Sequence, residues 1–278
     1  MTRWTGMLLL AFGLALTPHA RAGEPAPLVL GVFPYVTPVQ LAQFHTPLKD
    51  YLAKNLKRPV TLVTAPDFNS FFERTRQGQY DIFITAPNLG RFAETHDGHK
   101  RLAQTGHNIQ AIFLTRRDSD IQKIEDLRGK TIMIAQPISL LYQMAENLIR
   151  EEGLVPGESV TIIETRTHNN SMYAPLRGEA DASVTGMLLW QVLGQEQKDQ
   201  MRVIGLTEEA PGFMVMANKR LSTKDINKIQ ALLLDYHNVA DGKRYFETTG
   251  YKQFIKIENT VMEKLDPYTK ILLKPASP

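Results

Sequence analysis

The chain has 278 residues, of which 43% are hydrophobic and 22% are charged. This composition is that of one large or two moderate globular domains, and it excludes a small disulfide scaffold, a disordered chain and a collagen-like repeat. Positive and negative side chains are nearly balanced, and the formal net charge of +3 is too small for a typical nucleic-acid-binding surface. The absence of cysteine excludes disulfides, thiol nucleophiles and cysteine-bound zinc.

The first residues are predicted to be a secretory signal. Residues 6–17 form a short apolar stretch after Arg3, and Ala20-Arg21-Ala22 places small residues at the usual cleavage spacing. The apolar stretch is shorter than the roughly 20 residues that a membrane-spanning helix needs. We therefore expect residues 1–22 to be removed after Ala22 and the mature protein to be periplasmic. An uncleaved membrane anchor is the alternative.

Two parts of the chain, about 100 residues apart, carry the same order of segments. The strand-like runs LVLGVF (28–33) and TIMIAQ (131–136) are each followed by proline, and GQYD (78–81) matches GEAD (178–181). Each copy is predicted to form strand, helix, strand, helix, strand, because apolar runs alternate with amphipathic stretches. The aspartates that close the two GxxD runs are expected to have a structural role, tying down an adjacent turn.

The first helix of the first copy carries Leu41, Phe44, Leu48 and Leu52 on one face. Thr46-Pro47 is expected to kink or restart that helix, because proline cannot donate the backbone hydrogen bond of a helix interior. Near the end of the chain, Ser222 begins a capping-box pattern that predicts a C-terminal helix.

The segments outside the two copies are expected to join them. A strand at residues 109–116 is assigned to the first lobe, so the chain is predicted to cross at Arg116–Asp120. It is predicted to return at Glu208–Gly212, between strands at 201–207 and 213–218.

The predicted fold class is α/β: two doubly wound α/β lobes joined by a two-crossover hinge, with a ligand cleft between them. The expected boundaries are a signal peptide at 1–22, lobe I at 23–117, lobe II at 118–210 and the return to lobe I at 211–278.

Ligands of open α/β sheets bind beyond the carboxyl ends of the strands, where helix N-termini present unpaired N–H groups. The loops predicted at this edge are rich in hydrogen-bond donors and poor in acids, which favours a small anionic or strongly polar ligand. The candidate ligand-binding residues are Tyr35, Thr37, Thr85, Asn88, Gln136, Ser139, Tyr142, His168, Asn169, Asn170 and Ser171.

Alternatives stay open for several of these residues. Ser139, Asn69 and Ser171 are equally expected to cap helices, and His168 is equally typical of a turn. His96-x-x-His99 lacks the glutamate of a zincin motif. We predict no metal, no cofactor and no catalytic residue.

Several short motifs occur in a characteristic order: Pro47-Leu48 with Tyr51-Leu52, residues 78–82 before Ala86-Pro87, residues 118–121 before 126–130, His168-Asn169-Asn170 before Gly178, and residues 249–251 before Phe254. In these motifs the chain resembles, over nearly its whole mature length, the phosphate/phosphite/phosphonate substrate-binding proteins of ABC importers, a family of type II periplasmic binding proteins. The resemblance implies capture of a small ligand in the periplasm and delivery to a permease, with no chemistry on the ligand.

The sequence departs from the family pattern in the expected cleft. Where anion-binding members carry Asp-Pro followed by Ser-Thr-Ser-Gly, this chain has residues 136–140 (QPISL), and only Ser139 matches. Asn88-Leu89-Gly90 stands where a cleft tyrosine is often found. These departures affect the expected phosphonate specificity rather than the expected fold.

Three functions remain at this point. The first is a monomeric solute-binding protein that delivers a small anionic ligand to an ABC permease. The second is a periplasmic sensor of the same shape that reports to a sensor kinase or redox system. The third is a small-molecule enzyme on the same fold, with His168 as its one candidate acid or base.

Overall fold

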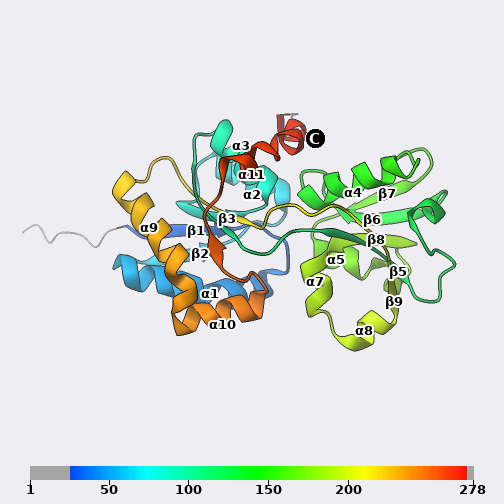
Figure 1. The fold of residues 1–278 in the computed structure, drawn as a ribbon, viewed down its shortest axis with the longest axis horizontal. Helices are drawn as coiled ribbons and strands as arrows, with labels where there is room; N and C mark the ends of the chain where they lie inside the picture. Colours follow the sequence, from blue (N-terminus) through cyan, green and yellow to red (C-terminus); the bar gives the residue numbers. More distant parts are fainter. Residues whose placement is uncertain (1–25, 274–278) are drawn as a thin grey trace, which may run out of the picture.

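A computed structural model describes residues 26–273, which form two β-sheets with helices packed on both faces of each (Figure 1). The α/β class and the two lobes predicted from the sequence are confirmed. We call the first sheet with its helices lobe I and the second lobe II. The predicted signal segment, residues 1–22, lies outside the described residues. Within residues 26–273, no helix combines the length and apolar character needed to cross a bilayer.

Lobe I is built on a six-stranded sheet of order β11-β4-β10-β3-β1-β2. Its strands are β1 (Leu28–Val32), β2 (Val60–Val63), β3 (Ile82–Thr85), β4 (Lys100–Thr105), β10 (Met214–Ala217) and β11 (Phe254–Ile255). Strands β2, β1 and β3 are parallel, and β10 lies antiparallel between β3 and β4. Strands β3 and β10 are buried along their whole length, as expected for a sheet covered on both faces.

Lobe II has a five-stranded sheet of order β7-β6-β8-β5-β9. Its strands are β5 (Ala111–Arg116), β6 (Thr131–Ala135), β7 (Thr161–Thr165), β8 (Ala182–Gly186) and β9 (Met201–Leu206). Strands β7, β6 and β8 are parallel, and β5 lies antiparallel between β8 and β9. The two sheets therefore share one plan, in which three parallel strands are followed by an antiparallel one.

Helices cover both faces of each sheet (Figure 1). In lobe I they are α1 (Pro38–Leu56), α2 (Phe68–Arg76), α3 (Pro87–Thr95), α9 (Thr223–Asp235), α10 (Ala240–Thr249), α11 (Asn259–Glu263) and the 3₁₀ segments η2 (Tyr236–Asn238) and η3 (Asp266–Leu273). In lobe II they are α4 (Leu140–Glu151), α5 (His168–Met172), α6 (Ala174–Arg177), α7 (Met187–Val192), α8 (Gln195–Asp199) and the 3₁₀ segment η1 (Ile124–Leu127).

Two symmetric aspartates support the duplication. A carboxylate oxygen of Asp81 accepts the N–H of Val29 at 2.8 Å, and that of Asp181 accepts the N–H of Thr131 at 2.7 Å. Each bond joins the residue that precedes β3 or β8 to the start of the neighbouring parallel strand. A structural role is thus confirmed for both aspartates, although each holds a neighbouring strand rather than an adjacent turn.

The position of the first crossing corrects the sequence analysis. Strand β5 pairs with β8 and β9, so it belongs to lobe II and the chain crosses at residues 106–110 rather than at Arg116–Asp120. The boundary between lobe I and lobe II, expected after residue 117, therefore lies before β5, within residues 106–110. An apolar strand at a lobe boundary fits either neighbouring sheet, and local sequence does not contain the long-range pairing that decides between them.

The return crossing, residues 207–213, includes the expected Glu208–Gly212. Ile109 and Ala210 exchange backbone hydrogen bonds of 2.8 and 2.7 Å, so the two crossings form a short antiparallel pair. A Cβ atom at Gly212 would lie 2.2 Å from the carbonyl oxygen of Thr105, which explains glycine at that position.

Two helices of lobe I test the local predictions. Helix α1 is preceded by its N-cap residue Thr37, whose side chain forms a capping box with Gln40, and it runs as one helix through Pro47. The predicted restart at Pro47 is therefore wrong. Ser222 caps α9 by accepting the N–H of Asp225, so the predicted helix start is confirmed. The carboxylate of Asp225 accepts the Ser222 hydroxyl instead of the Ser222 backbone N–H, so the predicted capping box is not formed.

Candidate ligand-binding cleft

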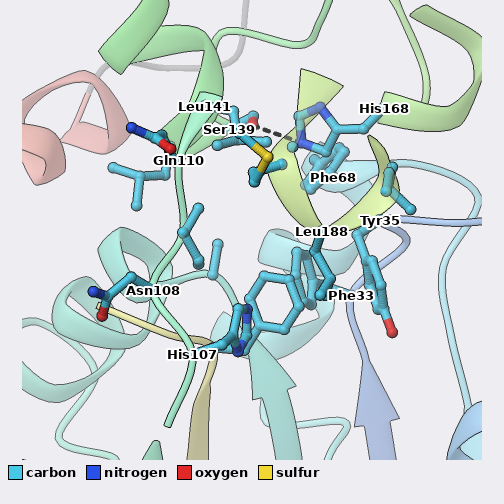
Figure 2. Close-up of a pocket in the computed structure, with 17 residues that line it drawn as sticks. Phe33, Tyr35, Phe68, His107, Asn108, Gln110, Ser139, Leu141, His168 and Leu188 are labelled. Carbon is cyan, nitrogen blue, oxygen red and sulfur yellow. Dashed lines mark hydrogen bonds between the residues drawn. The ribbon is translucent and has the colours of Figure 1, made fainter. Parts of the chain in front are cut away.

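A narrow cavity of about 50 Å³ lies between the lobes (Figure 2). Both lobes and both crossings contribute to its walls, and the space is enough for a few water molecules. Its lining residues are Phe33, Tyr35, Phe68, Ala86, His107, Asn108, Ile109, Gln110, Ser139, Leu140, Leu141, His168, Gly186, Met187, Leu188, Leu189 and Phe213.

The lobe I wall of the cavity is aromatic. Phe33, the residue after β1, meets Phe213 of the second crossing edge-on, with ring centroids 4.8 Å apart, and stacks on Tyr35 at 5.0 Å. Phe68, at the start of α2, packs on the ring of Phe33, with ring centroids 5.9 Å apart. Offset and edge-on pairs at these distances are favourable and leave the ring faces in a fixed arrangement.

Tyr35 turns its hydroxyl away from the cavity, as Figure 2 shows. The hydroxyl lies 3.2 Å from Nε2 of buried His45 and also bonds the hydroxyl of Tyr251. Nδ1 of His45 lies 3.1 Å from the hydroxyl of Tyr245. Burial lowers the pKa of His45 to about 3, so this group of four side chains is uncharged at neutral pH. Tyr35 therefore offers the cavity its ring rather than a donor.

The lobe II wall carries a buried polar pair. The hydroxyl of Ser139 lies 3.0 Å from Nε2 of His168, and both side chains are buried (Figure 2). Burial lowers the pKa of His168 to about 4, so the imidazole is neutral at neutral pH. Ser139 occupies the N-cap position of α4, but its hydroxyl is directed to His168 and does not cap the helix. The first-turn N–H groups of α4 thus have no capping side chain at this wall.

Two hydrogen bonds close the lobes on each other. Oε1 of Gln136 accepts the N–H of Phe68 at 3.2 Å, and Nδ2 of Asn88 donates to the carbonyl of Ile138 at 3.0 Å. Phe68 also meets His168 edge-on, with ring centroids 5.4 Å apart. Gln136 and Asn88 therefore lie at the interface between the lobes, where they bond protein groups.

The other candidate residues do not line the cavity. Thr37 caps α1, and the hydroxyl of Ser171 donates to the carbonyls of His168 and Val184. Thr85 is buried at the end of β3, and its hydroxyl has no hydrogen-bond partner. The remaining three are half-buried Tyr142 and Asn169 and exposed Asn170. Of the eleven predicted residues, Tyr35, Ser139 and His168 are the ones that reach the cavity.

The residues that cap helices α2 and α5 are not the ones that the sequence pattern suggested. Asp67 caps α2 and Thr167 caps α5, each through its side-chain oxygen. Asn69 and Ser171 lie inside those helices, so the capping interpretation of Asn69, Ser139 and Ser171 is wrong.

Several cavity residues escaped the sequence analysis. Phe33, Phe68, Phe213 and Leu188 are apolar residues at element ends, and they are indistinguishable from core residues in the sequence alone. His107 lies in the first crossing and stacks on Tyr251 at 5.1 Å, and burial lowers its pKa to about 4. Both crossings line the cavity, so the hinge and the candidate cleft share residues.

Comparison with known proteins identifies the family. Residues 30–261 match the family described as ABC transporter, phosphonate, periplasmic substrate-binding protein. A binding protein component of an ABC phosphonate transporter from Pseudomonas aeruginosa superposes with a TM-score of 0.80 at 17% identity, covering 89% of this chain and 87% of that one.

Two other solved structures share the fold. PhnD1 from Prochlorococcus marinus, in complex with methylphosphonate, has a TM-score of 0.79 at 16% identity, covering 90% of this chain and 99% of its own. XAC2383 from Xanthomonas citri, bound to ATP, has a TM-score of 0.70 at 18% identity, with 88% and 96% covered. The chain thus belongs to the phosphonate family of periplasmic substrate-binding proteins of ABC transporters.

Proposed function

We propose that the protein captures a small oxyanion of the phosphonate type between its lobes and delivers it to an ABC permease. The observation that supports this most directly is the wall of lobe II, where the buried Ser139–His168 pair lies at the uncapped N-terminus of α4. The match to the phosphonate family supports the same ligand class.

The electrostatics of this wall suit an anion without a cationic side chain. A helix N-terminus carries a partial positive charge and unpaired N–H groups, and oxyanions bind at such ends. The described residues that line the cavity include no aspartate or glutamate to repel an anion. If Nε2–H of His168 donates to the Ser139 oxygen, the hydroxyl proton of Ser139 is free to donate to the ligand.

The closed lobes require an opening step before a ligand enters. A cavity of about 50 Å³ is too small for a phosphonate in the observed arrangement. Rotation about the two crossings would break the Gln136–Phe68 and Asn88–Ile138 bonds and expose the wall of lobe II. We infer that these two bonds hold the closed form and reform around the bound ligand.

Calorimetry with phosphate, phosphite and methylphosphonate tests the ligand class. We expect a phosphonate to bind and Ser139→Ala to weaken it about tenfold or more, because a hydrogen bond to a charged acceptor contributes roughly 1.5 to 3 kcal/mol. Asn170→Ala, at an exposed position of helix α5, which begins at His168, is the control and should leave affinity unchanged. Equal affinities of wild type and Ser139→Ala would contradict the assigned wall.

Delivery to a permease needs its own experiment. Crosslinking in intact cells followed by purification should recover the permease subunits of an ABC importer. Recovery of a sensor-kinase ectodomain in their place would favour the sensory alternative, since both functions use the same cleft.

A further inference from the structure

The cavity has the Ser139–His168 pair at one end and mainly aromatic and aliphatic side chains over the rest of its wall, interrupted by His107, Asn108 and Gln110 of the first crossing. Phe33, Tyr35, Phe68 and Phe213 supply aromatic rings from lobe I and the second crossing, and Leu188 faces them from lobe II (Figure 2). Among the described lining residues, none is Asp, Glu, Lys or Arg. A ligand that reaches the Ser139–His168 pair therefore extends its other end into an uncharged, largely aromatic space.

Most polar groups near this apolar wall have protein partners, whereas Nδ1 of His107, a cavity residue of the first crossing, is buried without one. The Tyr35 hydroxyl bonds His45 and Tyr251, behind the ring that faces the cavity. In the first crossing, Nε2 of Gln110 donates to the carbonyl of Thr207 at 2.7 Å, and Asn108 bonds Glu209. A charged substituent on the ligand would lose its hydration here, and the described cavity lining contains no side chain of opposite charge.

We propose that the cleft holds its ligand through an uncharged alkyl or aromatic group packed on this wall, and that it selects such phosphonates over inorganic phosphate and aminoalkylphosphonates. This inference rests on the proposed function, because it assigns the second half of the same ligand. The oxyanion group lies at the lobe II wall, and the apolar group lies among the rings of lobe I.

Leu188 limits the size of this apolar group. Leu188 belongs to lobe II, but its side chain reaches Gly250 of lobe I. A Cβ atom added to Gly250 would lie 2.7 Å from Cδ1 of Leu188. Figure 2 shows Leu188 beside Phe33, inside the aromatic wall. In the closed form this side chain fills space that a longer substituent needs, so shortening it enlarges the apolar end without touching the polar pair.

The decisive comparison uses two phosphonates of nearly equal size. Propylphosphonate and 2-aminoethylphosphonate differ by a terminal methyl group against an ammonium group. We expect calorimetry to show propylphosphonate binding at least about tenfold more tightly, because the ammonium group is buried without a side chain of opposite charge. From methyl- to propylphosphonate, affinity should rise by about fourfold for each methylene group that is buried.

Leu188→Ala tests the size limit, with Leu206→Ala as the matched control on a side chain that is 47% exposed in β9. We expect Leu188→Ala to shift the preference toward butyl- and phenylphosphonate relative to methylphosphonate, and Leu206→Ala to leave the series unchanged. An unchanged series in Leu188→Ala would overturn the assignment of this residue.

The remaining outcomes separate this inference from the proposed function. Phosphate or 2-aminoethylphosphonate binding as tightly as propylphosphonate would overturn the apolar selection and leave the phosphonate function standing. Binding of benzyl alcohol but of none of the phosphonates would support the apolar wall and overturn the oxyanion assignment. If no compound in the series binds, both proposals are wrong.

Discussion

The residue that follows the first strand of each lobe shows how far the two lobes have diverged. Phe33 follows β1 and Gln136 follows β6, and each is followed by proline. Phe33 is 2% exposed and packs on the rings of Tyr35, Phe68 and Phe213, whereas Gln136 bonds across the cleft to the backbone of Phe68. Equivalent positions of the duplicated unit thus have different roles: Phe33 packs in the aromatic wall of lobe I, and Gln136 joins the two lobes.

The same contrast holds for the aspartate anchors. Asp81 bonds the backbone of β1 and also pairs with Arg220, through contacts of 3.0 Å to Nε and 2.8 Å to Nη2. Asp181 bonds the backbone of β6 and is exposed. Duplication preserved the geometry of the fold, while lobe I gained the additional contacts that its long-range return strand makes possible.

The largest difference in stability is expected between substitutions of Phe33 and Gln136, the residues that follow the first strand of each lobe. Phe33→Ala should lower the free energy of unfolding by about 3 to 5 kcal/mol, because it removes a ring buried among four others. Gln136→Ala should change stability by about 1 kcal/mol and shift the lobes toward the open form, because it removes one interlobe hydrogen bond. Urea unfolding and small-angle scattering measure the two effects, and equal losses of stability would contradict the division of roles.

Substitutions of Asp81 and Asp181 should differ less in the stability that they cost. Asp81→Ala removes a backbone hydrogen bond and an ion pair with a half-exposed arginine, and we expect a loss of about 3 kcal/mol in urea unfolding. Asp181→Ala removes one backbone hydrogen bond, and we expect about 1.5 kcal/mol. Equal costs would show that the Arg220 contact adds nothing to the anchor in lobe I.

Buried histidines provide a comparison that depends on pH. Burial lowers the pKa of His45 in lobe I to about 3 and that of His168 in lobe II to about 4. The unfolded chain takes up these protons near pH 6.5 and the folded protein does not, so stability is complete above that pH and falls as the pH drops toward the folded values. Between pH 7 and pH 5 we expect each histidine to account for about 2 kcal/mol.

The variants His45→Asn and His168→Asn should each reduce this loss of stability between pH 7 and pH 5, measured by urea unfolding. His96→Asn, at an exposed histidine, is the control. A pH dependence that is the same in all three variants would show that neither buried histidine is responsible.

The sequence was sufficient for the repeated unit, because alternating apolar and amphipathic segments and the paired GxxD runs are local signals. It also placed Ser139 and His168 at one edge of a sheet, since both follow the carboxyl ends of parallel strands. The pairing of β5 with β8 and β9 was not predictable, because it joins residues 67 to 94 positions apart that local patterns do not link.

The aromatic wall was missed for a related reason. Phe33 and Phe213 look like ordinary core residues, and only the packing of the return crossing against β1 turns them toward a cavity. Tyr35 was expected to donate a hydrogen bond to the ligand. Its hydroxyl faces His45 because α1 and α10 bring two further polar side chains behind the ring.

The antiparallel strand in each sheet has a consequence for the order in which the chain folds. Residues 111–206 contain all five strands of the lobe II sheet, so its contacts form within one continuous stretch. The lobe I sheet needs β10, which pairs with β3 about 130 residues earlier and arrives only after lobe II has been made. Closing so long a loop is slow, and it leaves the edge of β3 unpaired in the meantime. We therefore expect lobe I, although it contains the first of the described strands, to finish folding last.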